Sequence, residues 1–342
     1  MKWRPSKEFK KQKKLENSYL NFEGSIFHTT SQAAKIIFCF VCTGMFLSGD
    51  GDRLKVTMAS ISPQKLVARV DRVASAISVR ILDRDFLGSG FMVQHSDGDY
   101  IVITNQHVLR AGEAPYKIET VDGKTYAAEV ITDMSNVDYQ YDLAILKFTA
   151  DSPYKTATIG SFSNLNVGER VFAAGFPYQE SDSSQTPDLF SESQLASQAL
   201  ALKQGRIAIV LDRALEEGYQ IGYTNDVKKG MSGGALLNDR GEVIGVNGKH
   251  AYPLWESPEI YQDGSEPCPA LQELITRSSL AIPIEKSIEI ATQLKSLKSA
   301  SVKLEYTDDS PAKDSALVAK MQAIAESTKK QCRQQRSVLK NQ

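Results

Sequence analysis

Cysteine, surplus charge of one sign and long apolar runs are all scarce in this sequence. The formal net charge is only −1, so composition gives no electrostatic argument for a nucleic-acid partner. No segment reaches the roughly 20 apolar residues that a membrane-spanning helix requires. Outside one short apolar run, only Cys268 and Cys332 remain, too few and too far apart for a metal site. We therefore expect no metal, no other cofactor and no nucleic-acid partner.

The N-terminus is basic, and a short apolar run follows it at residues 36–47. The basic residues are Lys2, Arg4, Lys7, Lys10, Lys11, Lys13, Lys14 and Lys35. A positive segment before an apolar run of this length is typical of a secretory signal peptide. We predict export to a bacterial periplasm or to the outside of the cell, with residues 1–49 as a signal or a membrane tether. A translation start further downstream and a buried helix of the folded domain are the alternatives.

The four cysteines form two pairs along the chain. Cys39 and Cys42 lie inside the apolar run and would leave with a cleaved signal, so their spacing does not indicate a redox site. Cys268 and Cys332 could form a disulfide after export, in an oxidising environment. Spacing alone does not decide between that disulfide and two free thiols.

The rest of the chain has the composition of a packed domain, with 42% hydrophobic and 24% charged residues. Short β-branched and aromatic runs recur between residues 77 and 284, separated by turn signals such as Asp-Gly. Many short strands of this kind predict an all-β sandwich or barrel. The expected division is a linker at 50–64, a β-rich domain with short flanking helices at 65–298, and a polar, partly helical tail at 299–342.

The most informative motif is Gly-Met-Ser-Gly-Gly, in which Ser232 stands between Gly230 and Gly234. Glycines on both sides allow a tight turn that presents the hydroxyl. They also let backbone N–H groups approach a bound carbonyl oxygen closely. Taken alone, the motif is equally compatible with a glycine-rich hairpin connection.

Two further segments supply partners for this serine. His107 lies in Thr-Asn-Gln-His-Val, directly after an apolar β-branched run, and Asp142 begins the apolar run Asp-Leu-Ala-Ile-Leu. A histidine that removes the serine proton and an aspartate that orients the histidine would make Ser232 a nucleophile. His95 and His250 are the rival histidines and are expected at the surface. Asp133 and Asp138 lie near Asp142 but begin no apolar run.

The chain resembles the trypsin-like serine peptidases, and among them the bacterial Deg/HtrA-like branch, over about residues 65–290. The resemblance rests on five motifs in the family's order: Gly88-Ser-Gly-Phe, Thr104-Asn-Gln-His-Val, Asp142-Leu-Ala-Ile-Leu, Ala174-Gly-Phe-Pro and Gly230-Met-Ser-Gly-Gly. It implies two antiparallel six-stranded β-barrels with the active site between them, here followed by a helical C-terminal extension. We see no PDZ domain, which departs from full-length members of that branch.

The resemblance also implies roles for individual residues. His107, Asp142 and Ser232 would form the catalytic triad, and the N–H groups of Gly230 and Ser232 would form the oxyanion hole. Asn247 and Gly248 would pair with the substrate as an added β-strand.

Two residues beside the serine bear on activation and specificity. Met231 precedes it, which excludes activation through the aspartate ion pair of trypsin-type zymogens. Asp226 lies six residues before it, where trypsins place the acid that binds Arg or Lys. An ordinary surface-loop residue beside Lys228 and Lys229 is the alternative.

The predicted function is therefore that of a serine endopeptidase, a hydrolase acting on protein or peptide substrates. The first alternative is a catalytically silent protein of the same fold that binds peptides or acts like a chaperone. The second is a scaffold at the membrane surface that works through its basic N- and C-terminal segments. The presence of all three catalytic residue types favours the enzyme over the first alternative.

Overall fold

A computed structural model describes five ranges of the chain: residues 62–131, 141–178, 199–252, 258–293 and 315–340. The expectations for the signal or anchor, for Cys39 and Cys42, and for Asp133 and Asp138 lie outside the described residues. Everything below concerns the unit Met58–Gln342, in which all the described residues fall.

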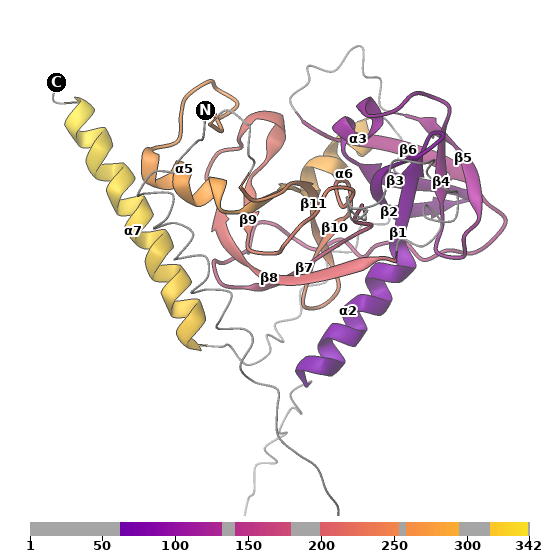
Figure 1. Cartoon of the computed structure of the whole chain (residues 1–342), viewed down its shortest axis with the longest axis horizontal. Helices are drawn as coiled ribbons and strands as arrows, with labels where there is room; N and C mark the ends of the chain where they lie inside the picture. Colours follow the sequence, from indigo (N-terminus) through magenta and orange to yellow (C-terminus); the bar gives the residue numbers. More distant parts are fainter. Residues whose placement is uncertain (1–61, 132–140, 179–198, 253–257, 294–314, 341–342) are drawn as a thin grey trace, which may run out of the picture. The chain divides into compact units, whose positions relative to one another are not determined.

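The first half of this unit forms a closed antiparallel barrel in the order β1-β2-β3-β6-β5-β4 (Figure 1). Its strands are β1 (Ser78–Leu82), β2 (Phe86–Ser96), β3 (Asp99–Thr104), β4 (Tyr116–Glu119), β5 (Thr125–Val130) and β6 (Ala144–Thr149). The central strand β3 is buried from Tyr100 to Thr104, because its side chains fill the barrel on one face and meet neighbouring elements on the other.

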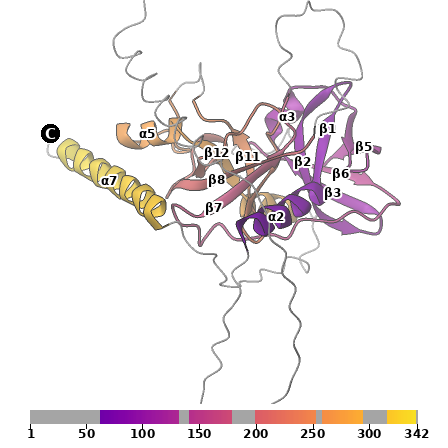
Figure 2. The same cartoon turned by 60° about the horizontal axis from the view of Figure 1, so that its bottom comes forward.

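The second half forms another closed antiparallel barrel, in the order β10-β11-β12-β9-β8-β7. Its strands are β7 (Arg170–Gly175), β8 (Ala201–Val210), β9 (Ile221–Tyr223), β10 (Ala235–Asn238), β11 (Val243–Lys249) and β12 (Ser279–Pro283). The two barrels lie side by side in both views (Figure 1 and Figure 2). The fold prediction of two six-stranded antiparallel barrels is confirmed.

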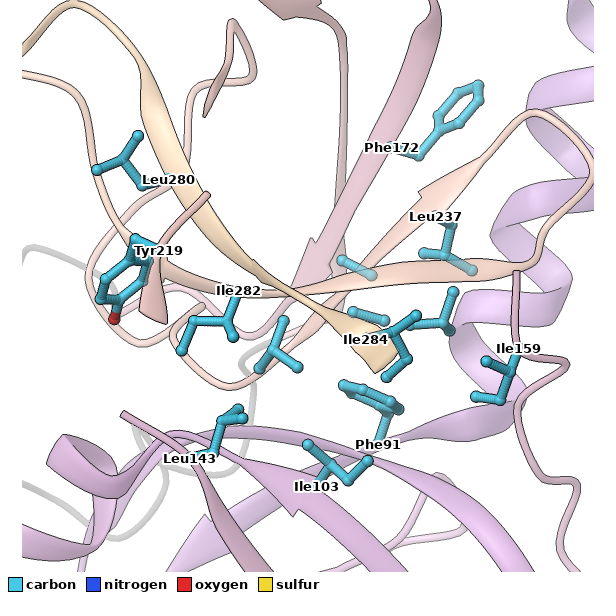
Figure 3. Close-up of a cluster of buried hydrophobic side chains, with 14 of the residues drawn as sticks. Phe91, Ile103, Leu143, Ile159, Phe172, Tyr219, Leu237, Leu280, Ile282 and Ile284 are labelled. Atoms are coloured by element: carbon cyan, nitrogen blue, oxygen red, sulfur yellow. The ribbon is translucent and has the colours of Figure 1, made fainter. Parts of the chain in front are cut away.

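A shared hydrophobic core joins the barrels. Figure 3 shows Phe91 and Ile103 of the first barrel facing Ile282 of the second barrel and Ile284, which follows β12 directly, all of them almost completely buried. Burial of large apolar side chains is the main stabilising contribution to such a contact, at about 25 cal/mol per Å². The positions of the two barrels are therefore fixed by the same kind of packing as their interiors.

Helices close the ends of the β-rich body. They are α2 (Pro63–Ile77), α3 (Gln106–Arg110), the 3₁₀ turn η1 (Glu216–Gly218), α5 (Pro269–Thr276), α6 (Ile284–Gln293) and α7 (Ser315–Lys340). Helix α2 begins where the Ser62 side chain accepts a hydrogen bond from the Lys65 N–H, and it buries a stripe of residues spaced three or four apart. Among the described helices, none is long and apolar enough to cross a membrane.

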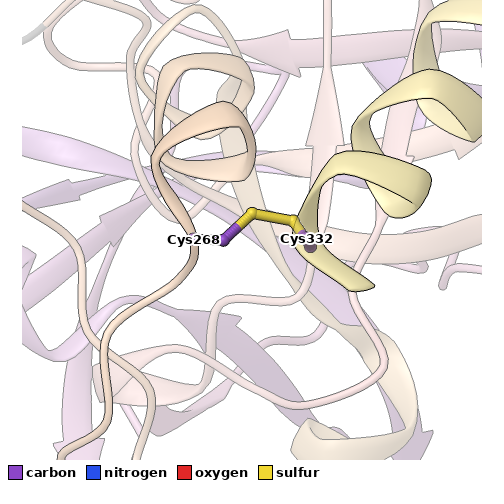
Figure 4. The surroundings of a disulfide bond; sticks show 2 residues. All are labelled: Cys268 and Cys332. Carbon is purple, nitrogen blue, oxygen red and sulfur yellow. A yellow bond between two sulfur atoms is a disulfide. The ribbon is translucent and has the colours of Figure 1, made fainter. Parts of the chain in front are cut away.

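Helix α7 is held to the second barrel covalently as well as by packing. Cys332 on α7 forms a disulfide with Cys268, the residue before α5 (Figure 4). Val318 packs against Gly168, and the Gln322 amide donates to the Val167 carbonyl. Of the two alternatives for these cysteines, the structure has the disulfide, and the expected helical C-terminal extension is present.

Candidate active site

The turn that carries His107 follows β3 and is held by side-chain hydrogen bonds. Thr104 Oγ1 donates to the Ser89 carbonyl at 2.7 Å, and Asn105 Nδ2 donates to the Asp142 carbonyl at 2.7 Å. Both side chains are buried. The motif Thr-Asn-Gln-His thus begins with two residues that fix where α3 starts and where His107 points.

Asp142 and His107 are joined twice. His107 Nδ1 lies 2.5 Å from Asp142 Oδ2, and the His107 N–H donates to Asp142 Oδ1 at 2.8 Å. The Asp142 side chain is 1% exposed, whereas the His107 ring is 40% exposed and open to a reactant. Burial raises the pKa of Asp142, but the hydrogen bonds and charge of His107 outweigh it and hold that pKa below its ordinary value. The carboxylate therefore stays ionised.

A third donor reaches the same carboxylate from the second barrel. The Tyr219 hydroxyl donates to Asp142 Oδ2 at 2.5 Å, and Tyr219 is completely buried. Tyr219 is not among the site residues that the sequence predicts. A tyrosine after a glycine carries no local signal that separates a site residue from an ordinary core residue.

Ser232 lies in a turn whose shape depends on glycine. Gly230 and Gly233 have φ values of +91° and +82°, in the region that favours glycine. A Cβ on Gly233 would lie 2.2 Å from both the Ser89 carbonyl oxygen and Thr104 Oγ1. The Ser232 carbonyl accepts from the Ser89 N–H at 2.9 Å, so this turn is attached directly to the first barrel.

The same turn leaves two N–H groups without an acceptor. The Lys229 carbonyl accepts from the Tyr178 N–H at 2.8 Å, and the Gly230 carbonyl accepts from Ser89 Oγ at 2.7 Å. These two bonds fix the carbonyl groups of the turn. The N–H groups of Gly230 and Ser232, in contrast, have no acceptor among the described residues. Two unpaired donors in one rigid turn can bind the oxygen of a tetrahedral intermediate.

The Ser232 hydroxyl is hydrogen-bonded to a backbone carbonyl and not to the histidine. Ser232 Oγ donates to the Gly248 carbonyl at 3.1 Å, and among the described residues it makes no hydrogen bond with His107. Gly248 lies in a β-bulge, where the register between β11 and β12 shifts between Asn247 and Lys249. The bulge presents the Gly248 carbonyl to the serine.

Asn247 and Gly248 are the two residues that were expected to pair with the substrate. Asn247 is fully buried, and its side chain accepts from the Tyr223 hydroxyl at 2.9 Å and donates to backbone carbonyls of the second barrel. Its own N–H and C=O bond to Gly234 and Gly233. The main chain of Asn247 is thus bonded to the turn that carries Ser232, and Gly248 follows it in the bulge.

Asp226 is not brought to the triad. Its side chain is 65% exposed and lies 2.9 Å from Lys228 Nζ. The neighbours Asn225 and Val227 are buried, so Asp226 occupies the outward face of an extended segment. Its position corresponds to the surface-loop alternative.

The surface assignment of the two rival histidines matches the structure, because His95 and His250 are both exposed. Within the described ranges, no group of three or more His, Cys, Asp or Glu side chains could hold a metal ion.

Comparison with known proteins identifies the β-rich body. The family described as "Trypsin-like peptidase domain" matches residues 88–246, which include His107, Asp142 and Ser232. This part of the chain is a trypsin-like peptidase domain. The similar proteins have names that specify serine proteases of the HtrA type.

Three relatives illustrate the extent of the similarity. The chain is 31% identical to the serine protease HTRA4 of Mus musculus over 160 residues and to the serine protease HTRA1 of Xenopus tropicalis over 160 residues. It is also 31% identical to the serine protease Do-like HtrA of Bacillus subtilis (strain 168) over 161 residues. Each alignment covers 47% of this chain but only 29%, 30% and 32% of the respective relatives. The similarity thus spans about a third of the length of these relatives.

Proposed function

We propose that this chain is a serine endopeptidase that hydrolyses peptide bonds through His107, Asp142 and Ser232. The observation that carries the proposal is the doubly hydrogen-bonded His107–Asp142 pair, together with a serine turn in which two N–H groups have no acceptor among the described residues. The trypsin-like peptidase domain supports the same chemistry.

The reaction would begin with rotation of the Ser232 side chain. In the resting arrangement its hydroxyl donates to Gly248, and a rotation about the Cα–Cβ bond would exchange that acceptor for His107 Nε2. Ser232 Oγ would then attack the carbonyl carbon of the substrate while His107 takes its proton. The Asp142 carboxylate would fix the imidazole tautomer and stabilise the imidazolium without being protonated.

The tetrahedral oxyanion would accept hydrogen bonds from the Gly230 and Ser232 N–H groups. A single donor of this kind contributes on the order of 3–4 kcal/mol to the transition state. His107 would give its proton to the departing amine as the C–N bond breaks, which leaves an acyl-enzyme on Ser232. Water, deprotonated by His107, would then attack the ester, and the proton would return to Ser232.

We propose protein or peptide chains as substrates, held by strand pairing beside the serine. This pairing would begin at Gly248, whose carbonyl accepts from the Ser232 hydroxyl at rest, while Asn247 supports it from inside the barrel. The exposure of Asp226 favours side-chain preferences other than for Arg and Lys.

We further propose that the protein works outside the cytoplasm, with residues 1–49 as its signal or membrane tether and residues 65–298 as the peptidase domain. The Cys268–Cys332 disulfide supports this, because such bonds persist mainly in oxidising compartments.

Labelling with a serine-directed fluorophosphonate tests the activity without a known substrate. Wild-type protein should be labelled, and Ser232→Ala and His107→Ala should not. Absence of labelling in folded wild-type protein would overturn the proposal. It would favour the catalytically silent peptide-binding alternative, for which the lack of a Ser232–His107 hydrogen bond at rest is the supporting observation.

A further inference from the structure

We propose that Tyr219 is a positioning residue of the triad, whose hydroxyl orients the Asp142 carboxylate toward His107 from the opposite barrel. The inference rests on the proposed function, in which His107 is the base. It goes beyond that function by assigning to the second barrel a part in holding the acid–base pair of the first.

The carboxylate has three donors on its two oxygens. Oδ1 accepts from the His107 N–H at 2.8 Å, and Oδ2 accepts from His107 Nδ1 and from the Tyr219 hydroxyl, each at 2.5 Å. Two of these donors belong to the histidine, which moves a proton during the reaction. Tyr219 is the donor among the three that does not belong to His107.

A strained turn delivers Tyr219 to this position. Glu217 and Gly218 have φ values of +60° and +89°, and a Cβ on Gly218 would lie 2.3 Å from the Tyr141 ring. The Glu217 carbonyl in the same turn accepts from the Asp142 N–H at 2.8 Å. One turn of the second barrel therefore holds both the backbone and the carboxylate of Asp142.

Gly248 provides the space that the hydroxyl occupies. A Cβ at Gly248 would lie 2.1 Å from the Tyr219 oxygen, so any side chain there would displace the hydroxyl from Asp142. The Gly248 carbonyl is the acceptor of the resting Ser232 hydroxyl. Tyr219 thus lies between the aspartate and the residue at which we expect substrate pairing to begin.

Four other charged groups surround the pair. Arg110 Nη2 lies 3.9 Å from Asp142 Oδ1 and 3.6 Å from Glu217. Lys249 Nζ lies 2.9 Å from Glu259, 3.8 Å from Glu217 and 4.8 Å from the centre of the Tyr219 ring. Tyr219→Phe leaves all four groups unchanged, so any change in His107 titration reports the hydroxyl alone.

Removing the hydroxyl has a defined electrostatic sign. Burial raises the pKa of Tyr219 well above its ordinary value, so the hydroxyl remains a donor throughout the working range. Without that donor, the carboxylate presents more negative charge to His107 and stabilises the imidazolium. In Tyr219→Phe the midpoint of the measured His107 titration should therefore move to higher pH, and kcat should fall by about 10-fold to 100-fold with KM little changed.

The test is an NMR titration of His107 with ¹⁵N-labelled histidine, in the Ser232→Ala background to prevent self-cleavage. The chain has four histidines, and loss of one resonance in His107→Ala assigns the signal. Tyr100→Phe is the matched control. Tyr100 is also fully buried, and its hydroxyl contacts only the Ser152 carbonyl and the Tyr154 N–H among the described residues.

A higher His107 pKa in Tyr219→Phe, with no change in Tyr100→Phe, would support the inference. An unchanged or lower pKa in folded Tyr219→Phe would overturn it. If circular dichroism shows that Tyr219→Phe does not fold, Gly248→Ala provides the same test by crowding the hydroxyl from the other side. The titration needs no turnover, so it remains decisive if the wild-type protein proves to hydrolyse no peptide and the proposed function fails.

Discussion

The turns that carry His107 and Ser232 meet at one site but are held by different means. The His107 turn is held by side chains, through Thr104 and Asn105. The Ser232 turn depends on glycine, because Gly233 has no Cβ and fits directly against the first barrel, where Ser89 Oγ also donates to the Gly230 carbonyl. A side-chain anchor can be weakened one hydrogen bond at a time, whereas a glycine contact is lost completely when a single Cβ is added. The two halves of the site should therefore respond to substitution in different ways.

Ser232→Ala should have the largest effect on activity while leaving both turns in place. The kcat for peptide hydrolysis should fall by about 10⁶-fold, and adding His107→Ala should lower it little further, because the residues act as a unit. Unfolding should be almost unchanged, since the hydroxyl makes one hydrogen bond, to the Gly248 carbonyl. Casein cleavage by purified Ser232→Ala at the wild-type rate would contradict the triad.

Gly233→Ala should show how a turn held by glycine fails. The added Cβ combines a positive φ with two contacts at 2.2 Å, so the unfolding free energy should fall by about 3 kcal/mol or more. Gly123→Ala is the matched control, because φ there is +76° and no atom lies within 4 Å. Gly123→Ala should lower the unfolding free energy, measured by urea denaturation, by only about 1–2 kcal/mol. Equal losses in the two variants would mean that the barrel contact is unimportant.

Asn105→Ala should show how a turn held by side chains fails. Loss of the buried hydrogen bond to the Asp142 carbonyl should cost about 1–3 kcal/mol of stability and lower kcat by about tenfold. Asn166→Ala, which removes an exposed amide that donates to the Asn164 carbonyl and to Glu169 Oε1, is the control and should have little effect on either quantity. A wild-type kcat in Asn105→Ala would show that His107 is oriented without this anchor.

Acid should weaken the fold through Asp142. Burial raises its pKa, but the hydrogen bonds from His107 and Tyr219 hold that pKa below the ordinary value of 3.8. The unfolded chain then binds the proton more readily, so stability falls as pH drops below about 4, through the folded-state pKa. Urea unfolding at several pH values should show this loss in wild type and a shallower pH dependence in Asp142→Asn. Identical profiles would assign the acid sensitivity to other groups.

Asp226→Ser should have the smallest effect of the series. Exposed ion pairs such as that of Asp226 with Lys228 contribute at most about 1 kcal/mol, so stability should change little. The ratio of cleavage after Arg or Lys to cleavage after Leu or Ala should stay within about twofold, because the carboxylate faces solvent. A selective loss of cleavage after basic residues in a peptide library would restore Asp226 to the specificity pocket.

The sequence predicted the parts of the site that depend on short motifs. His107, Asp142 and Ser232 each lie in a local pattern of strand, turn and small residues, so they could be assigned before the structure was known. The short β-rich runs likewise predicted an all-β sandwich or barrel, and the resemblance to trypsin-like peptidases implied its division into two six-stranded barrels.

The other features depend on contacts between distant segments. Tyr219 reaches Asp142 across 77 positions of sequence, and nothing near it in the chain indicates that contact. The role of Asp226 in a specificity pocket was predicted from its offset of six residues from Ser232. In the structure its neighbours Asn225 and Val227 are buried, so the Asp226 side chain faces outward. Whether the Ser232 hydroxyl faces His107 or Gly248 depends on a side-chain rotation, which the sequence does not specify.

The disulfide between Cys268 and Cys332 has a consequence for any cut in the intervening chain. A single break at any point between the two cysteines leaves both fragments covalently joined. Self-cleavage there would pass unnoticed on a non-reducing gel and would appear as two bands only after reduction. The cystine would then be the covalent link between the helical extension and the barrel, and a reductant would leave only packing to hold the extension in place.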